Sequence, residues 1–162
     1  MSSTELPEKT HREITRFITT HDANVKATFE TGLEEKVHWE RTNIGCDLFL
    51  AYTTRKFPAP LSHDEDLSVL QYVDYHPGGE PAWHRTVTLD FGVANEGELE
   101  LELESGEKRL IKAGDVAVQK GTNHSWRNPS KTVFARALYF AMNASPVIVN
   151  GEPLEESLGV VE

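Results

Sequence analysis

Hydrophobic and polar residues alternate most regularly in ELELELE, residues 98–104. Side chains of a strand point alternately to its two faces, so Leu99, Leu101 and Leu103 are expected to share the inner face and the four glutamates the outer one. The next residues, SGEK, have the composition of a tight turn, and KRLIK then returns along a partner strand. This stretch therefore predicts an antiparallel β-hairpin.

Other short apolar runs with turn residues between them predict further strands. They cover residues 12–20, 24–30, 46–54 and 67–75, and others follow the turns at 113–115 and 128–131. The Pro- and Asp-containing residues 56–66 are expected to form a loop. No stretch has a sustained helical period, and short strands at intervals of roughly 8–12 residues are typical of an antiparallel sandwich or barrel. We therefore expect one all-β domain.

The stretch WHRTVTLDFG, residues 83–92, combines an apolar face with a polar one. If it forms one strand, the polar face carries His84, Thr86, Thr88 and Asp90. Burying such a row is unfavourable unless its members are paired, bound to a metal or lining a wet pocket. This strand is therefore the first candidate for a functional site.

Composition narrows the classes of partner. The 162 residues carry a formal net charge of −10 and no helix-turn-helix pattern, which disfavours a nucleic-acid partner. No apolar run approaches the roughly 18–20 residues of a membrane helix, and the first residues lack a secretory pattern, so we expect a cytoplasmic protein without a membrane partner. Cys46 is the single cysteine, which excludes an internal disulfide.

Two blocks of the sequence resemble the paired motifs of the cupin family. The first block holds Gly78, His84, Thr86, Asp90 and Gly97, and the second holds Gly114, Asp115, Gly121, His124 and Asn128. The chain departs from the usual pattern because Thr86 replaces a second histidine and Asp90 replaces a glutamate. Gln119 stands where the second motif has a proline, and the run from Gly114 to His124 is one residue short. Residues 81–129 are also similar to small single-domain cupins of fungi and bacteria.

The resemblance implies the cupin architecture, a double-stranded β-helix or jelly-roll barrel with an N-terminal β-hairpin. We expect residues 1–45 to form an N-terminal extension with the hairpin, 46–145 the barrel and 146–162 a C-terminal tail. The resemblance also implies a homodimer, in which the hairpin at 12–30 adds a strand to the neighbouring subunit's sheet.

The resemblance places His84, Asp90 and His124 together inside the barrel and leaves two interpretations open. In one, they hold a divalent transition metal (Fe, Mn, Zn, Ni or Cu) as a 2-His-1-carboxylate site. In the other, no metal is bound and the same three groups are catalytic acids and bases. No organic cofactor is expected in either case.

Three further residues are candidates for binding a small-molecule substrate. Thr86 lies on the polar face, and Trp126 shares a face with His124 and has the shape to stack on a ligand. Arg136 lies in phase with apolar neighbours, where it would either bind a substrate oxyanion or pair with Asp90 or a glutamate. Four histidines lie in predicted loops or near the N-terminus, and we expect them to be exposed to solvent: His11, His21, His63 and His76.

The subgroup resemblance implies an enzyme of polyketide or other secondary metabolism that acts on an organic acid or related metabolite. Our interpretation is a lyase, meaning a decarboxylase, a dehydratase or an isomerase-like enzyme that works by acid–base chemistry with or without a metal. One alternative is an iron-dependent cupin dioxygenase. The other is a cupin that binds a small ligand without catalysis.

Overall fold

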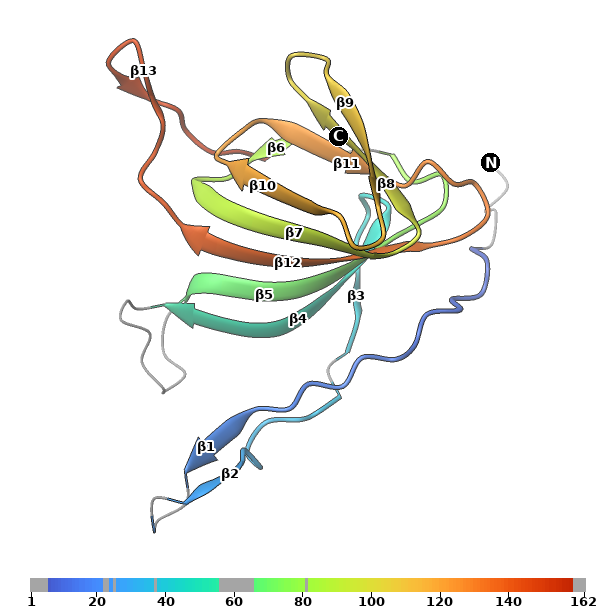
Figure 1. Cartoon of the computed structure of the whole chain (residues 1–162), viewed down its shortest axis with the longest axis vertical. Coiled ribbons are helices and arrows are strands. Elements are labelled where there is room, and N and C mark those ends of the chain that lie inside the picture. Colours follow the sequence, from blue (N-terminus) through green and yellow to red (C-terminus); the bar gives the residue numbers. More distant parts are fainter. Residues whose placement is uncertain are drawn as a thin grey trace.

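The computed structural model describes residues 6–21, 24, 26–36, 38–55, 66–80 and 82–158. Within them the chain forms two main antiparallel sheets that face each other as the layers of a barrel (Figure 1). None of these residues forms a helix long and apolar enough to cross a membrane. The predicted all-β cupin barrel is confirmed. The predicted loop at 56–66 falls almost entirely outside the described residues.

The larger sheet has six strands in the order β10, β7, β12, β5, β4 and β3. Their bounds are β3 (Glu40–Arg41), β4 (Cys46–Arg55), β5 (Asp66–Tyr75), β7 (Thr88–Glu96), β10 (Val116–Lys120) and β12 (Ala135–Asn143). The second sheet has five strands in the order β15, β6, β11, β8 and β9. Their bounds are β6 (His84–Arg85), β8 (Glu98–Leu103), β9 (Lys108–Lys112), β11 (His124–Arg127) and β15 (Ser157–Leu158).

The strand at residues 98–103 behaves as its alternation predicts. Leu99 is completely buried and belongs to the core between the sheets, with Leu101 packed against it. The outward glutamates meet cations on the flanking strands, Glu100 with Arg127 and Glu102 with Lys108. The acidic run is therefore the paired outer face of a strand.

The stretch at residues 83–92 is not the single strand that its alternation predicts. His84 and Arg85 form β6 in the five-stranded sheet, whereas Thr88 begins β7 in the six-stranded sheet. The chain crosses from one layer to the other between Arg85 and Thr88. His84 and Asp90 therefore belong to opposite walls of the barrel.

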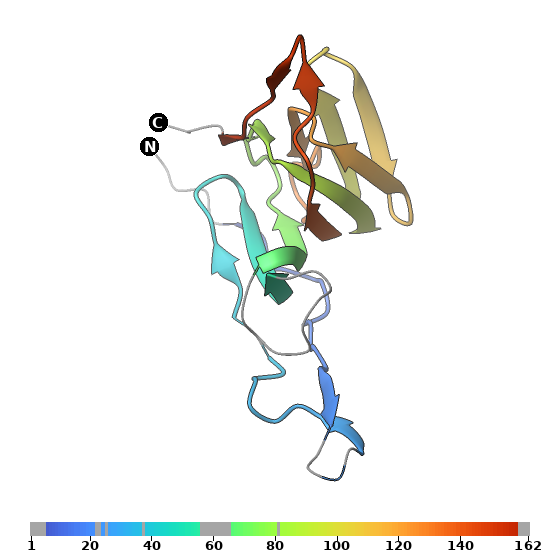
Figure 2. The same cartoon turned by 90° about the vertical axis from the view of Figure 1, so that its left-hand side faces the viewer.

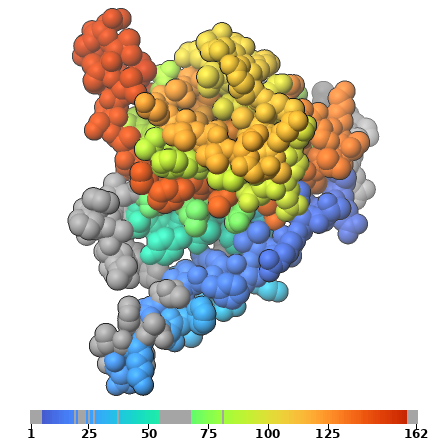
Figure 3. Space-filling model, viewed as in Figure 1, coloured from blue at the N-terminus to red at the C-terminus, as the bar shows by residue number. Residues whose placement is uncertain are grey.

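The N-terminal hairpin is present, although its paired strands are shorter than expected. β1 (Thr19–His21) pairs with β2 (Ala27–Phe29), and the residues before β1 form an extended arm (Figures 1 and 2). Arg16 holds this arm to the barrel by donating to the Ala51 carbonyl of β4, and it also donates to the Glu34 carbonyl of the segment that follows the hairpin. Figure 3 shows the hairpin projecting beyond the body of the molecule. The homodimer expected through it stays a prediction.

The C-terminal tail contributes short strands. β13 (Ile148–Val149) and β14 (Glu152–Pro153) form a small hairpin, and β15 then pairs with β6. Leu158 is the register partner of His84 in that ladder. The tail therefore supports the strand that carries His84.

Candidate functional site

Two histidines meet in the five-stranded sheet. His84 of β6 and His124 of β11 are direct register partners, and their ring centroids lie 4.3 Å apart. His124 is 2% exposed. The structure therefore brings together the two histidines that the motif resemblance singled out.

Backbone carbonyls orient both imidazole rings. Nδ1 of His84 lies 3.1 Å from the Ala82 oxygen, and Nδ1 of His124 lies 2.8 Å from the Thr122 oxygen. A carbonyl oxygen only accepts hydrogen bonds, so Nδ1 carries the proton in each neutral ring and Nε2 carries the lone pair. Two Nε2 atoms are thus available side by side for a proton or a ligand.

Burial holds His124 in its neutral form at physiological pH. Desolvation lowers its pKa to about 4, the hydrogen bond to Thr122 opposes this shift, and the charge of His84 adds to it. At pH 7 the ring is therefore neutral, and its Nε2 lone pair is unprotonated.

We expect the free energy of unfolding to fall by roughly 2 kcal/mol between pH 7 and pH 5 because of His124 alone. The pKa rises from about 4 in the folded chain toward the ordinary 6.5 on unfolding, so the unfolded chain binds more protons in this window. Urea titrations in chelator-containing buffer at both pH values measure the drop. The matched variant His124→Gln should show a drop smaller by that amount, and equal drops would contradict the assignment.

Asp90 lies on the opposite wall, in β7. Burial raises the pKa of its carboxyl group, while a hydrogen bond from Thr88 and the charge of His84 lower it. The Thr88 hydroxyl in turn lies 2.6 Å from the Thr86 hydroxyl. Oδ1 of Asp90 is buried without a hydrogen-bond partner. This wall of the barrel therefore presents an unsatisfied acceptor.

Aromatic residues lie beside this polar wall, where Trp126 donates to Gln119. Trp126 is buried and makes an edge contact with Tyr139 at 5.8 Å between centroids. The Tyr139 hydroxyl lies 2.9 Å from that of Tyr75. Trp126 is thus a wall residue here, and its predicted stacking on a ligand stays a prediction.

Replacing Gly92 with alanine is expected to destabilise the barrel by about 1–3 kcal/mol, the usual cost of overpacking a core. An added Cβ would lie 2.8 Å from Cε1 of Tyr139, whose ring is held between Trp126 and Tyr75. Chemical denaturation of Gly92→Ala measures the loss. Gly32→Ala is the control because its added Cβ meets only a glutamate side chain. A stable Gly92→Ala would show that this wall yields easily.

The described residues contain no group of three or more His, Cys, Asp or Glu side chains arranged to hold a metal ion. The two imidazoles suit a metal because each is oriented through Nδ1 and free at Nε2. Asp90, on the opposite wall, does not form such a group with them. The 2-His-1-carboxylate set is therefore not assembled in this structure.

Arg136 lies outside this site. Its guanidinium donates to both carboxylate oxygens of Asp74, at 2.6 and 2.8 Å, and to the Arg12 carbonyl at 2.7 Å. The sequence suggested Asp90 or a glutamate as a structural partner of Arg136. That prediction is wrong, because the partner is Asp74. In β12 the register partner of Asp90 is Ala141. Arg136 precedes Ala141 by five positions, or about 16 Å along the strand. Arg136 is thus too far to stabilise an oxyanion at the histidines.

A second ionic cluster surrounds Arg136 beneath the N-terminal arm. Lys9 lies 2.6 Å from Asp47 and 3.1 Å from Asp74, and His76 lies 2.9 Å from Asp47. His76 is 7% exposed, and the side chain of His11 is also buried. The expected exposure of these two histidines is therefore wrong, because both rings pack against Phe134 where the arm, which carries His11, meets the barrel. His63 lies outside the described residues.

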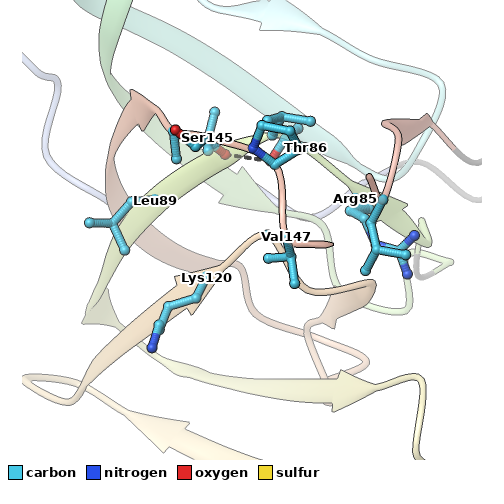
Figure 4. Close-up of a pocket in the computed structure, with 12 residues that line it drawn as sticks. Arg85, Thr86, Leu89, Lys120, Ser145 and Val147 are labelled. Carbon is cyan, nitrogen blue, oxygen red and sulfur yellow. Dashed lines mark hydrogen bonds between the residues drawn. The ribbon is translucent and has the colours of Figure 1, made fainter. Parts of the chain in front are cut away.

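A cavity of about 250 Å³ adjoins the crossing between the sheets (Figure 4). Its lining is mostly aliphatic, with Leu89 and Val147 among its members, and Arg85 and Lys120 add two cations. Thr86 lines this cavity and is hydrogen-bonded to Thr88, which links the cavity wall to Asp90.

Sequence reasoning did not recognise two inner-wall residues, Gln119 and Tyr139. In the sequence Gln119 stands out only as the residue at a proline position of the motif, and alternation alone does not show which way Tyr139 points. The burial pattern of β10 places Gln119 inward with Ala117, opposite Asp90. Recognising Gln119 requires the β7–β10 register, which places it beside the motif residue Asp90.

Comparison with known proteins agrees with this geometry. Residues 71–140 match the family described as Cupin domain. The chain is 62% identical to oryzines biosynthesis cluster protein J of Aspergillus oryzae, over 97% of this chain and 98% of that protein. It is 32% identical to a cupin-domain-containing oxidoreductase of Neurospora crassa, over 96% and 87%.

Among solved structures, an RmlC-like cupin from Shewanella frigidimarina superimposes with a TM-score of 0.53 at 14% identity. The match covers 68% of this chain and 86% of that one, and at this identity it concerns the fold. The sheet order, the paired histidines and the sequence relatives lead to the same conclusion. The chain belongs to the cupin family.

Proposed function

We propose that this chain is a cupin enzyme of fungal secondary-metabolite biosynthesis that transfers a proton within a small organic acid or polyketide-type metabolite. The observation that carries the proposal is the pair of imidazoles with both Nδ1 atoms bound to carbonyls and both Nε2 atoms free. The biosynthetic setting comes from the name of the 62% identical Aspergillus oryzae relative.

In the proposed reaction, Nε2 of His124 takes a proton from a substrate carbon next to a carbonyl group. The electron pair left on carbon delocalises into that carbonyl, and Asp90 stabilises the imidazolium that forms. The histidine pair then returns the proton. Return to another carbon gives an isomer, and return to a departing hydroxyl group releases water. Either outcome is balanced without an oxidant.

The substrate class rests on the biosynthetic setting of the relatives. The cavity beside Thr86 contains none of His84, Asp90 and His124, and its Lys120 belongs to the outward face of β10. Its Arg85 is paired with Glu104. We therefore give this cavity no part in the reaction, and Thr86 as a substrate contact stays a prediction.

A second candidate is an oxidoreductase, which is favoured by the name of the Neurospora crassa relative. His84 and His124 would hold a transition metal through Nε2, and such a metal would supply Lewis-acid or redox chemistry. Metal analysis of protein purified without a histidine tag tests this candidate. Near-stoichiometric metal in the parent, lost in His84→Gln, would support it.

The reaction class can be read from the change in substrate mass. We would add the purified protein to extracts of an Aspergillus oryzae strain lacking cluster protein J, in which the substrate of that relative should accumulate. The proposal predicts one metabolite that loses water or isomerises at constant mass. Loss of two hydrogens or gain of oxygen would favour the oxidoreductase, and no conversion would contradict both. The His84→Gln/His124→Gln double variant is the control.

A further inference from the structure

Gln119 is a buried amide on the inner wall that the proposed reaction does not use. It is 5% exposed and alternates inward with Ala117 along β10, while the strand's other residues point outward. Across the ladder its direct register partner is Asp90 of β7. It therefore stands beside the acceptor that faces the histidine pair.

Trp126 fixes the orientation of this amide. The indole Nε1 lies 3.3 Å from Oε1 of Gln119, and an indole nitrogen can only donate. The amide oxygen must therefore face Trp126, which also makes an edge contact with Tyr139. The NH₂ group is left pointing away from the indole, and Nε2 is buried without a hydrogen-bond partner.

The unsatisfied donor and the unsatisfied acceptor are neighbours. Gln119 Nε2 and Asp90 Oδ1 belong to register partners, yet neither satisfies the other. Buried polar groups are normally paired, so such a couple indicates a missing third group. A group that completes both must accept from an amide and donate to a carboxylate. A hydroxyl group does both with one oxygen.

We propose that Gln119 and Asp90 together hold one hydroxyl group of the substrate. Its oxygen accepts a hydrogen bond from Gln119 Nε2, and its proton is donated to Asp90 Oδ1. The substrate is therefore a hydroxy acid or a similarly hydroxylated metabolite. This inference rests on the proposed function, which places the substrate at this site. It makes Gln119 the residue that distinguishes a substrate with the hydroxyl group from one without it.

The chain offers a direct spectroscopic test because it contains two glutamines, Gln71 and Gln119. Protein labelled with ¹⁵N at glutamine gives two side-chain amide signals, which the Gln119→Glu variant assigns. The probes are three pairs that differ by one hydroxyl: malate and succinate, citrate and tricarballylate, and 3-hydroxybutyrate and butyrate. We expect at least one hydroxy acid to shift the Gln119 signal and to bind at least tenfold more tightly than its partner.

Gln119→Glu keeps an oxygen for Trp126 and replaces the NH₂ donor with an acceptor. It should weaken the hydroxy acid tenfold or more and change its partner less than threefold, with Gln71→Glu as the matched control. Equal affinities within every pair, binding of no probe, or an unchanged preference in Gln119→Glu would overturn the inference. Binding of no probe, or an unchanged preference in Gln119→Glu, would fit a buried water between the two side chains.

Failure of this inference and failure of the proposed function are distinguishable. The His84→Gln/His124→Gln double variant should retain the hydroxy-acid preference while losing turnover. If the preference is absent but the parent still converts a metabolite, the inference alone is wrong.

Discussion

Replacing His124 with glutamine is expected to lower turnover of the native substrate by about 10²–10⁴-fold, the usual contribution of a general base. Glutamine is uncharged and fills most of the ring's volume, so the barrel should still fold. The lost element is the Nε2 lone pair beside His84. Turnover in the extract assay and the circular dichroism spectrum measure the two effects separately.

His76→Gln is the matched control for this prediction. His76 is also buried, but it pairs with Asp47 beneath the N-terminal arm and lies outside the barrel site. We expect its replacement to lower stability and leave turnover nearly unchanged. Equal activity losses in the two variants would mean that His124 acts on the fold and not on the chemistry.

Replacing Arg136 with methionine is expected to destabilise the protein by about 3–5 kcal/mol, which approaches the whole stability of many domains. Asp74 is fully buried and receives two hydrogen bonds from this guanidinium. Without Arg136, Lys9 alone faces a carboxylate that cannot reach water. Urea denaturation at pH 7 measures the loss.

Two further variants show whether the loss comes from the uncompensated charge. Arg127→Met breaks the more exposed pair with Glu100 and should cost less than about 1 kcal/mol. Adding Asp74→Leu to Arg136→Met removes the stranded carboxylate and should recover part of the stability. A double variant no more stable than Arg136→Met would mean that packing, rather than charge, dominates.

The fold was largely predictable because alternation and turn chemistry are local. The residues of ELELELE reveal their inner face directly, and Leu99 is indeed fully buried. The same rule failed at residues 83–92, since alternation does not show where a chain leaves one sheet for another. That crossing is a tertiary event set by the pairing of His84 with His124 and of Thr88 with Asn143.

The site was predictable only in part, because motif positions identify residues and not their partners. The histidine pair followed from the two cupin blocks. The partner of Arg136 did not, since Asp74 lies 62 positions away and is opposed to it only through the β12–β5 register. Gln119 was likewise visible as an unusual residue, but its meaning required the Trp126 contact and the neighbouring Asp90.

The crossing between Arg85 and Thr88 also bears on what holds the two halves of the site at a fixed distance. The histidines belong to the five-stranded sheet, whereas Asp90 and Gln119 belong to the six-stranded one. Contacts between the layers, such as those of Trp126 with Gln119 and Tyr139, therefore fix the spacing between the two halves. A substitution that alters this packing would change the distance between the histidines and Asp90 without replacing any of them.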